Sequence, residues 1–418
     1  MNSEKQLQAI KSIQKKLLGK KLTYREIYTL MDEIAHRRLS DVLTTYFAAS
    51  SFKEGFTPDE LYYLAKAMVE TGTKLHFKGV VADKHSTGGV AGTRTTMIIV
   101  PIIAAAGIKI PKTSSRAITS PAGTADVMET LAKVKFSPKD IERIVDNVGG
   151  CIVWGGHLGI APADDIIIRI EEPLSFESFD KIIVSIMAKK VAIGTTHLVL
   201  DVPVGKTMKI RHFYDADKIR EKFKELAYRF HMKVVFDVNE TLEPAGRGVG
   251  PALEARDVLY VLEQKKDRPL KLEAKALRLA GKLLDLCFAD MPGKRRGEDE
   301  ATRILTQGLA LKKFREIIKA QHGNEQISSD TFKLKSHILE IRSTWSGKIR
   351  EINNYNLNTL AKVLGAPSDK YAGIYLFKKL DEFVEKREPL MRFYSSDKYR
   401  LKEAEISFRN FPVYEIES

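Results

Sequence analysis

The chain has 418 residues, of which 44% are hydrophobic and 29% are charged, a balance that excludes an intrinsically disordered protein. This length predicts two or three domains, each large enough to bury a core. The formal net charge of +14 favours an anionic partner, which leaves nucleic acid, a membrane surface and a small phosphorylated substrate open.

The longest apolar stretch, residues 97–108, contains a proline and is much shorter than the roughly 20 residues that a membrane-spanning helix needs. We therefore assign it to a core and expect no membrane partner. The two cysteines, Cys151 and Cys287, lack the spacing of a zinc site or a disulfide framework. We expect both to be small buried side chains, no metal site, and a cytoplasmic protein.

The first 70 residues have helical periodicity with marked helix starts. Thr23 and Glu26 have the spacing of a capping box, and Thr57 begins a second one. From about residue 80, short β-branched runs alternate with helical stretches and glycine turns, a pattern typical of an α/β domain with a largely parallel sheet. Residues 161 to about 194 are helical in pattern again, which a segment crossing back to the helical unit would explain.

The end of the chain differs in pattern from the α/β part. A charged stretch at residues 291–303 is typical of a surface loop that leads into a helix, and residues 322–331 are typical of a linker. The predicted organisation is a helical domain (residues 1–70 with 161–196), an α/β domain (71–160 with 197–330) and a C-terminal α+β domain (335–418).

The segment DKHSTGGVAGTRTT, residues 83–96, follows a predicted strand and precedes an apolar helix. Its glycines let backbone N–H groups approach an anion, and a charge and hydroxyl donors come from Lys84, Ser86, Thr95 and Thr96. It lacks the GK[ST] ending of a Walker A loop and differs from the GxGxxG dinucleotide fingerprint. The segment therefore favours phosphate binding over its alternative, a structural glycine turn.

A second polar segment, KTSSRAITSPAGTAD at residues 112–126, also follows a short strand and has many hydroxyl side chains around one arginine. In a parallel sheet both segments would lie at the carboxyl edge, where ligands bind. A solvated loop is the alternative. We interpret a third, glycine-containing segment at residues 246–257 as a loop and helix start that packs the domain.

Catalytic side chains are sparse in this pattern. His85 lies inside the first polar segment, although an isolated histidine is more often structural. No nucleophile and base have a recognisable spacing. That is compatible with a reaction in which phosphate is the nucleophile, because positioning and electrostatics can then supply most of the catalysis.

Several ordered motifs resemble those of the thymidine and pyrimidine nucleoside phosphorylase family: DKHSTGG, SSRAITSPAGTADVMETL, APADD and SIMAKK. The resemblance runs from about residue 22 to residue 390 and is closer to the AMP phosphorylases within that family. It implies a nucleoside phosphorylase type II-like architecture, with a cleft between a helical and an α/β domain and a C-terminal α+β domain. It also implies a homodimer, phosphate as co-substrate and no cofactor.

The resemblance implies site residues motif by motif. Those for inorganic phosphate are Lys84, Ser86, Thr96, Ser114 and Thr124, and those for the base are His85, Ser185 and Lys189. The nucleotide positions of the AMP phosphorylases correspond to Gly89, Ser115, Arg116, Ala117, Ile118, Thr119, Ser120, Thr124, Ser185 and Lys209. The proton donor to the departing base corresponds to Glu177, where that family more often has aspartate.

Three departures from the family pattern matter. An arginine that grips the pyrimidine in the nucleoside enzymes is replaced by Glu171, an acceptor that we expect to disfavour a thymine carbonyl and to suit adenine or cytosine. Pro121 replaces a small residue of the signature. The AMP phosphorylases also carry an additional N-terminal domain, whereas this chain starts close to the predicted helical domain, so we expect a simple dimer.

Together these features predict phosphorolysis of a nucleoside 5′-monophosphate, AMP or alternatively CMP or UMP, to a free base and ribose 1,5-bisphosphate. Arg116, Ser120 and Lys209 are expected to hold the 5′-phosphate. The alternative within the family is a thymidine or uridine phosphorylase, which needs no 5′-phosphate. A nucleic-acid-binding protein is the alternative from another class, and the absence of an RNP-like motif and of basic runs beyond residues 294–296 argues against it.

Overall fold

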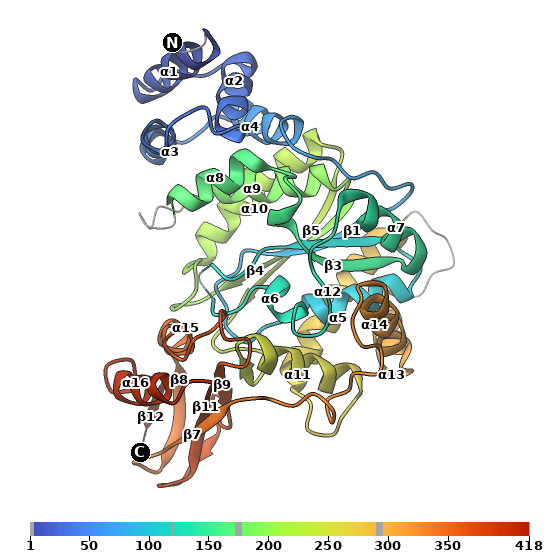
Figure 1. Ribbon diagram of the computed structural model, residues 1–418, viewed down its shortest axis with the longest axis vertical. Coiled ribbons are helices and arrows are strands. Elements are labelled where there is room, and N and C mark those ends of the chain that lie inside the picture. Colours follow the sequence, from blue (N-terminus) through green and yellow to red (C-terminus); the bar gives the residue numbers. More distant parts are fainter. Residues whose placement is uncertain (1–3, 119, 172–177, 290–295, 418) are drawn as a thin grey trace.

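The computed structural model describes residues 4–118, 120–171, 178–289 and 296–417. Three parts follow one another along the long axis of the molecule: a helical unit that contains the N-terminus, a central α/β part, and a C-terminal part with antiparallel sheets (Figure 1). The element order confirms the predicted fold class. The residue boundaries of the three domains stay a prediction.

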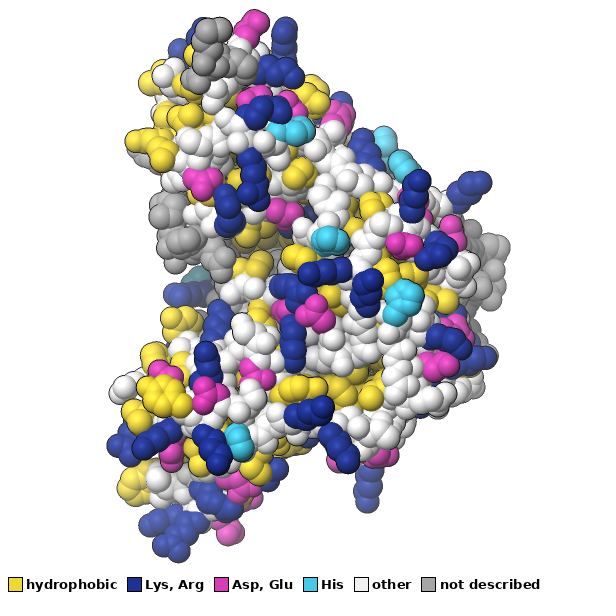
Figure 2. Space-filling model, in the orientation of Figure 1, with side chains coloured by type: hydrophobic (Ala, Val, Ile, Leu, Met, Phe, Trp, Pro, Cys, Tyr) yellow, Lys and Arg dark blue, Asp and Glu magenta, His cyan; other side chains and the backbone are white. Residues whose placement is uncertain are grey.

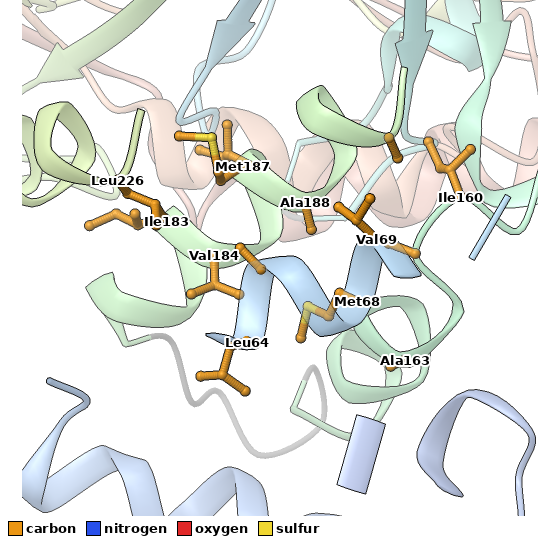
Figure 3. Packing of buried hydrophobic residues seen from close by; sticks show 14 of the residues in the cluster. Leu64, Met68, Val69, Ile160, Ala163, Ile183, Val184, Met187, Ala188 and Leu226 are labelled. Carbon is orange, nitrogen blue, oxygen red and sulfur yellow. The ribbon is translucent and has the colours of Figure 1, made fainter. Parts of the chain in front are cut away.

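The helical unit combines the first helices of the chain with two that come later in the sequence. Both expected capping boxes are present, with Thr23 and Thr57 as the N-cap residues. Leu64 and Met68 of α4 belong to the same buried hydrophobic cluster as Val184 of α9 (Figure 3). This shared core is why the chain returns to the helical unit after the first strands. The helices are α1 (Glu4–Leu17), α2 (Tyr24–Ala35), α3 (Asp41–Glu54), α4 (Pro58–Glu70), α8 (Pro162–Glu171) and α9 (Phe179–Ala192).

Five parallel strands form the centre of the α/β part. The strand order β1-β4-β5 is one set and β2-β3 the other, and a parallel bridge between Val81 and Lys109 joins them. The expectation of a largely parallel sheet is therefore confirmed, and the carboxyl ends of β1 and β2 lie at the same edge. The strands are β1 (Ala82–Ser86), β2 (Ile110–Ser114), β3 (Gly150–Trp154), β4 (His197–Val204) and β5 (Lys233–Glu240).

Helices cover the faces of this sheet. The apolar stretch assigned to a core lies mostly in α5, which is buried from Thr96 to Ala104. Cys151 and Cys287 are both free and buried, as expected. Among the described residues, none of the helices combines the length and the apolar character needed to cross a membrane. The helices of this part are α5 (Thr96–Ala105), α6 (Thr124–Met128), α7 (Pro138–Val148), the 3-10 helix η1 (Gly155–His157), α10 (Phe213–Arg229), α11 (Pro251–Leu262), α12 (Leu270–Phe288), α13 (Gly297–Thr306) and α14 (Leu309–Ala320).

The C-terminal part is joined to the α/β part through the third glycine-containing segment. This segment leads into α11, as interpreted, and it also forms β6, which pairs with β9. Gly250 has a φ of 117°, and a Cβ there would lie 2.4 Å from the carbonyl oxygen of Ala372, so only glycine allows the close approach. The sheets have the orders β6-β9-β11-β7 and β10-β8-β12. Their elements are β6 (Gly248–Val249), β7 (His337–Arg342), β8 (Gly347–Ile352), β9 (Gly373–Leu376), β10 (Phe383–Val384), β11 (Pro389–Ser395), β12 (Tyr414–Glu417), α15 (Asn354–Val363) and α16 (Lys398–Phe408).

Candidate active site

A cavity of about 650 Å³ lies between the carboxyl edge of the parallel strands and the helical unit. Its α/β wall is built from the residues that follow β1, β2 and β3, and its helical wall from α3, α4, α8 and α9. Eight Lys or Arg residues and four Asp or Glu residues line it, so the lining carries an excess of positive charge. A cavity of this size and charge suits a small anionic ligand.

The end of β1 supplies the first polar cluster. The Nζ atom of Lys84 lies 3.6 Å from Oδ2 of Asp201, and the Ser86 hydroxyl donates to the same oxygen at 3.0 Å. Asp201 lies in the parallel strand β4 and is also 3.1 Å from Lys275. Burial lowers the pKa of Lys84 to about 8, although the Asp201 carboxylate opposes this shift. Asp201 therefore holds a lysine and a hydroxyl together at the cavity, ready to bind an anion.

A second buried acid lies directly beneath this cluster. Asp83 is fully buried and forms ion pairs with Lys112, at 3.1 Å, and with Lys190. Burial lowers the pKa of Lys190 to about 7, with Asp83 opposing the shift. Burial, followed by the charges of Lys190, Lys112 and Lys84, holds the pKa of His85 well below its usual value. His85 is therefore a neutral imidazole at pH 7, which can hydrogen-bond a base without adding charge.

The second polar segment forms a tight loop organised by one buried carboxylate. Asp126 accepts hydrogen bonds from the backbone N–H of Ala117 at 2.7 Å and of Gly123 at 3.0 Å. It also accepts one from Arg116 at 2.8 Å, and Glu129 accepts two more from the same guanidinium, at 2.8 and 2.6 Å. Arg116 thus enters the cavity lining already paired with two acids, a feature that the sequence did not predict.

Arg94 connects the two polar segments. Its guanidinium donates to the Thr124 hydroxyl at 3.0 Å and to the Ala122 carbonyl at 2.8 Å. The same guanidinium forms an ion pair with the Glu254 carboxylate at 2.7 Å. Arg94, which the sequence analysis did not single out, therefore fixes Thr124 in the cavity lining. The sequence did contain a signal for it, because Arg94 is the one arginine in the glycine- and threonine-containing segment 83–96.

Gly89, in the first polar segment, lies against the side chain of Lys209. Gly89 has a φ of 84°, and a Cβ there would lie 2.9 Å from Cγ of Lys209. A side chain at position 89 would therefore displace the lysine stem. Both residues line the cavity, so the cation of Lys209 is delivered to the same space as that of Lys84.

The helical wall carries a different set of groups. Asp164 of α8 accepts a hydrogen bond from the Ser185 hydroxyl at 2.8 Å and lies 2.8 Å from Nζ of Lys189, both on α9. Glu171, at the end of α8, pairs with Lys181 of α9, and Lys181 also donates to the Ala48 carbonyl at 2.6 Å. The acceptor expected at Glu171 therefore comes with a donor beside it, because Lys181 also lines the cavity.

The structure brings most of the predicted site residues into one lining. Thr95 is fully buried and, like Ala117, does not border the cavity within the described part of the chain. Thr119 and the predicted proton donor Glu177 lie outside the described residues. Sequence reasoning missed Arg94, Asp164, Lys181 and Asp201 as partners of site residues. The predicted residues in the lining are Lys84, His85, Ser86, Gly89, Thr96, Ser114, Ser115, Arg116, Ile118, Ser120, Thr124, Glu171, Ser185, Lys189 and Lys209.

Comparison with known proteins agrees with this architecture. Residues 10–72 match the helical bundle domain of a glycosyl transferase family, residues 78–224 its a/b domain, and residues 348–414 the pyrimidine nucleoside phosphorylase C-terminal domain. An AMP phosphorylase from Thermofilum pendens is 44% identical over 95% of this chain and 76% of its own length. The chain belongs to the pyrimidine nucleoside phosphorylase family of glycosyltransferases. Its class of activity is that of a nucleoside or nucleotide phosphorylase.

Other relatives of this family divide between two substrates. An AMP phosphorylase from Methanococcus maripaludis is 42% identical over 97% of this chain and 80% of its own length. A protein from Bradyrhizobium diazoefficiens, described provisionally as a thymidine phosphorylase, is 42% identical over 93% of this chain and 75% of its own length. The anthranilate phosphoribosyltransferase structure from Thermus thermophilus superposes with a TM-score of 0.61 at 18% identity, covering 75% of this chain and 99% of its own, which shows the shared fold.

Proposed function

We propose that this enzyme catalyses the phosphorolysis of a nucleoside 5′-monophosphate, with AMP as the preferred substrate. An oxygen of inorganic phosphate attacks C1′ of the ribose, the C1′–N bond breaks, and the base leaves with a proton from an acid. The products are the free base and ribose 1,5-bisphosphate. The chain's relation to AMP phosphorylases agrees with this proposal, but relatives of similar identity are described provisionally as thymidine phosphorylases, so the choice between nucleotide and nucleoside rests on the side chains of the cavity.

The observation that carries the proposal is that two sets of anion-binding side chains line a single cavity. Lys84, Ser86 and Thr124 form one set, a cation with hydroxyl groups, which we assign to inorganic phosphate. Lys209 and Ser120 form the other set, a cation with a hydroxyl, which we assign to a 5′-phosphate. A nucleoside phosphorylase needs only the first of these, whereas a nucleotide phosphorylase needs both.

Catalysis in this arrangement comes from positioning and charge. Lys84 and its neighbours hold the attacking phosphate and offset its charge, while the helical wall orients the base. We assign proton donation to Glu177, since His85 is neutral and an isolated neutral imidazole is a weak acid. Ser185 and Lys189, both fixed by Asp164, would contact the base edge.

One assay separates the proposed function from its rival. The enzyme is mixed with inorganic phosphate and, in parallel, with AMP, CMP, UMP, adenosine, thymidine or uridine, and released base is measured by chromatography. We expect base release from AMP, dependent on phosphate, and a much lower rate from adenosine. Release from thymidine or uridine without release from any nucleotide would contradict the proposal.

The second candidate is a thymidine or uridine phosphorylase. One observation favours it: Lys181 lies beside Glu171 and supplies a donor close to the position at which the family's nucleoside enzymes have an arginine. The face of the molecule shown in Figure 2 gives no support to nucleic-acid binding. Lys and Arg side chains are scattered over the visible face, interleaved with acids, rather than gathered in one stripe (Figure 2).

A further inference from the structure

The C-terminal part of the chain contacts the loop that we assign to the 5′-phosphate. Nζ of Lys370 lies 3.3 Å from Oδ1 of Asp126 and 2.9 Å from Oε2 of Glu129. Both carboxylates also hold Arg116. Near the same loop, Nζ of Lys362 on α15 donates to the carbonyl oxygen of Ile118 at 3.0 Å. Two lysines of the C-terminal part therefore touch a segment that lines the cavity of the other two parts.

The four charged side chains form a balanced quartet. Arg116 and Lys370 carry two positive charges, and Asp126 and Glu129 carry two negative charges. Hydrogen bonds from Arg116 are the largest cause that lowers the pKa of Glu129 to about 2, so this carboxylate is ionised at every pH at which the enzyme would work. Asp126 is only 2% exposed, whereas the side chains of Arg116 and Lys370 are each 29% exposed. Asp126 is thus buried, whereas Glu129, with 30% of its side chain exposed, and both cations reach solvent.

Arg116, which shares Asp126 and Glu129 with Lys370, is itself part of the cavity lining. Its guanidinium lies 4.8 Å from the centre of the Trp154 ring, and both residues line the cavity. The three hydrogen bonds to the acids use three of its five N–H donors. Arg116 can therefore turn toward an incoming dianion only if the carboxylates it leaves are neutralised by another cation.

We propose that Lys370 is a positioning residue for nucleotide recognition, because it compensates Asp126 and Glu129 and so lets Arg116 turn to bind the 5′-phosphate. Lys362 supports this role by fixing the Ile118 carbonyl and hence the loop. The inference rests on the proposed function, since it concerns recognition of the 5′-phosphate. It makes the C-terminal part, which contributes no side chain to the described cavity lining, a determinant of substrate choice.

The experiment compares AMP and adenosine as substrates for the full chain. In K370M the uncompensated acids hold Arg116 more tightly and repel the phosphate, so we expect KM for AMP to rise about tenfold, or about 1.4 kcal/mol. We expect kcat, KM for inorganic phosphate and the slow cleavage of adenosine to stay within twofold. K370R keeps the charge and should keep the KM for AMP of the unmodified enzyme.

The decisive variant is the double substitution E129Q/K370M. It removes one charge of each sign, so the charges of the cluster balance again with Arg116 facing Asp126 alone, and we expect KM for AMP to return to within about threefold of the starting value. A purely structural role for Lys370 predicts no such rescue. The matched control is E382Q, which removes another ion pair between these parts, 3.6 Å from Arg247 and away from the loop. It should leave KM for AMP unchanged.

The outcomes separate the two proposals. If the unmodified enzyme cleaves nucleosides and no nucleotide, the proposed function and this inference both fail. If it prefers AMP but K370M has an unchanged KM, or the double variant shows no rescue, the inference alone fails. K370Q, which keeps a polar group at the interface, replaces K370M if thermal unfolding shows that K370M is not folded, and the same outcomes then decide.

Discussion

The two walls of the cavity are stabilised in different ways. On the α/β wall, Lys84 and Ser86 are held by Asp201, and all three sit on neighbouring parallel strands whose register the backbone hydrogen bonds fix. On the helical wall, the ion pairs of Lys189 and Lys181 cross from α9 to α8, with no backbone ladder between the two helices. Under the proposed function, the sheet fixes the end of the cavity that binds phosphate, whereas single substitutions can change the end that binds the base. We infer that this difference lets a family keep its reaction while its substrates differ.

The largest effect is expected at the acid assigned to protonate the base. General acid catalysis contributes typically about 10²- to 10⁴-fold, so Glu177→Gln should lower kcat for AMP by about that factor. Nucleotide binding should change little, because the amide is nearly the same size. Stopped-flow or steady-state kinetics with AMP, together with equilibrium binding of AMP without phosphate, measure both quantities. Unchanged turnover would remove Glu177 from the mechanism and leave base release to the α/β wall alone.

The next largest effect is expected on the α/β wall. Lys84 is assigned to bind and orient the attacking phosphate, and misplacement of a reactant can cost about 10²-fold, so Lys84→Gln should lower kcat/KM for phosphate by about that factor. Asp201 keeps Lys275 and Asn239 as partners, so the fold should persist. The control is Lys282→Gln, a lysine that pairs with Asp237 at 2.6 Å and lies outside the cavity lining. Equal losses in both variants would mean that Lys84 acts only through stability.

The pH dependence should also separate the walls. Burial lowers the pKa of Lys84 to about 8, so the free enzyme loses this proton above pH 8 and kcat/KM for phosphate should fall about tenfold for each further pH unit. On the helical wall the pKa of Lys189 is raised, because Asp164 and Asp165 outweigh burial, so binding of AMP alone should be insensitive to pH in this window. In Lys84→Arg, the fall of kcat/KM for phosphate should begin at a higher pH. A fall that begins near pH 7 in the unmodified enzyme would indicate the titration of Lys190 instead.

Above pH 8, the contribution of Lys84 to the free energy of unfolding should rise while activity falls. The folded pKa of Lys84, about 8, lies below its ordinary value of 10.5. Between these values the unfolded chain binds more protons than the native one, so the contribution of Lys84 to the free energy of unfolding rises with pH. The loss of activity above pH 8 is therefore not expected to reflect unfolding through this group, and thermal unfolding at pH 7.5 and 9 checks this.

Sequence reasoning found the parallel strands, the helical unit and most residues of both polar segments, because hydrophobic periodicity and glycine spacing are local signals. It missed the partners that hold those residues. Asp201 and Ser86 are 115 positions apart, and only the pairing of β1 with β4 brings them together. It also treated Arg116 as available to bind the 5′-phosphate, whereas in the structure the Arg116 guanidinium is paired with Asp126 and Glu129. Long-range ion pairs of this kind leave no periodic trace in a sequence.

A smaller effect is expected at the centre of the helical wall. Asp164→Asn weakens the hold on Lys189 but keeps an acceptor for the Ser185 hydroxyl. Since the lysine side chain is 25% exposed, its loss of a counter-ion is partly screened, and we expect KM for AMP to rise about fivefold, with KM for phosphate unchanged. Asp41→Asn, which removes the exposed pair with Arg169 in the same helical unit, should have no effect. A parallel rise in both KM values would show that the two walls are coupled.

The smallest effect should appear at Glu171, which the sequence analysis identified as a departure from the nucleoside enzymes. Glu171 and Lys181 form one pair that offers both an acceptor and a donor to the base edge. In Glu171→Gln the amide can itself donate or accept, and Lys181 loses its counter-ion, so discrimination between an amino group and a carbonyl weakens. We expect the ratio of kcat/KM for AMP to that for UMP to fall about three- to fivefold, measured by competition between the two nucleotides. A ratio that stays constant would mean that the base is read elsewhere on the helical wall, at Ser185 and Lys189, and that Glu171 serves only to hold Lys181.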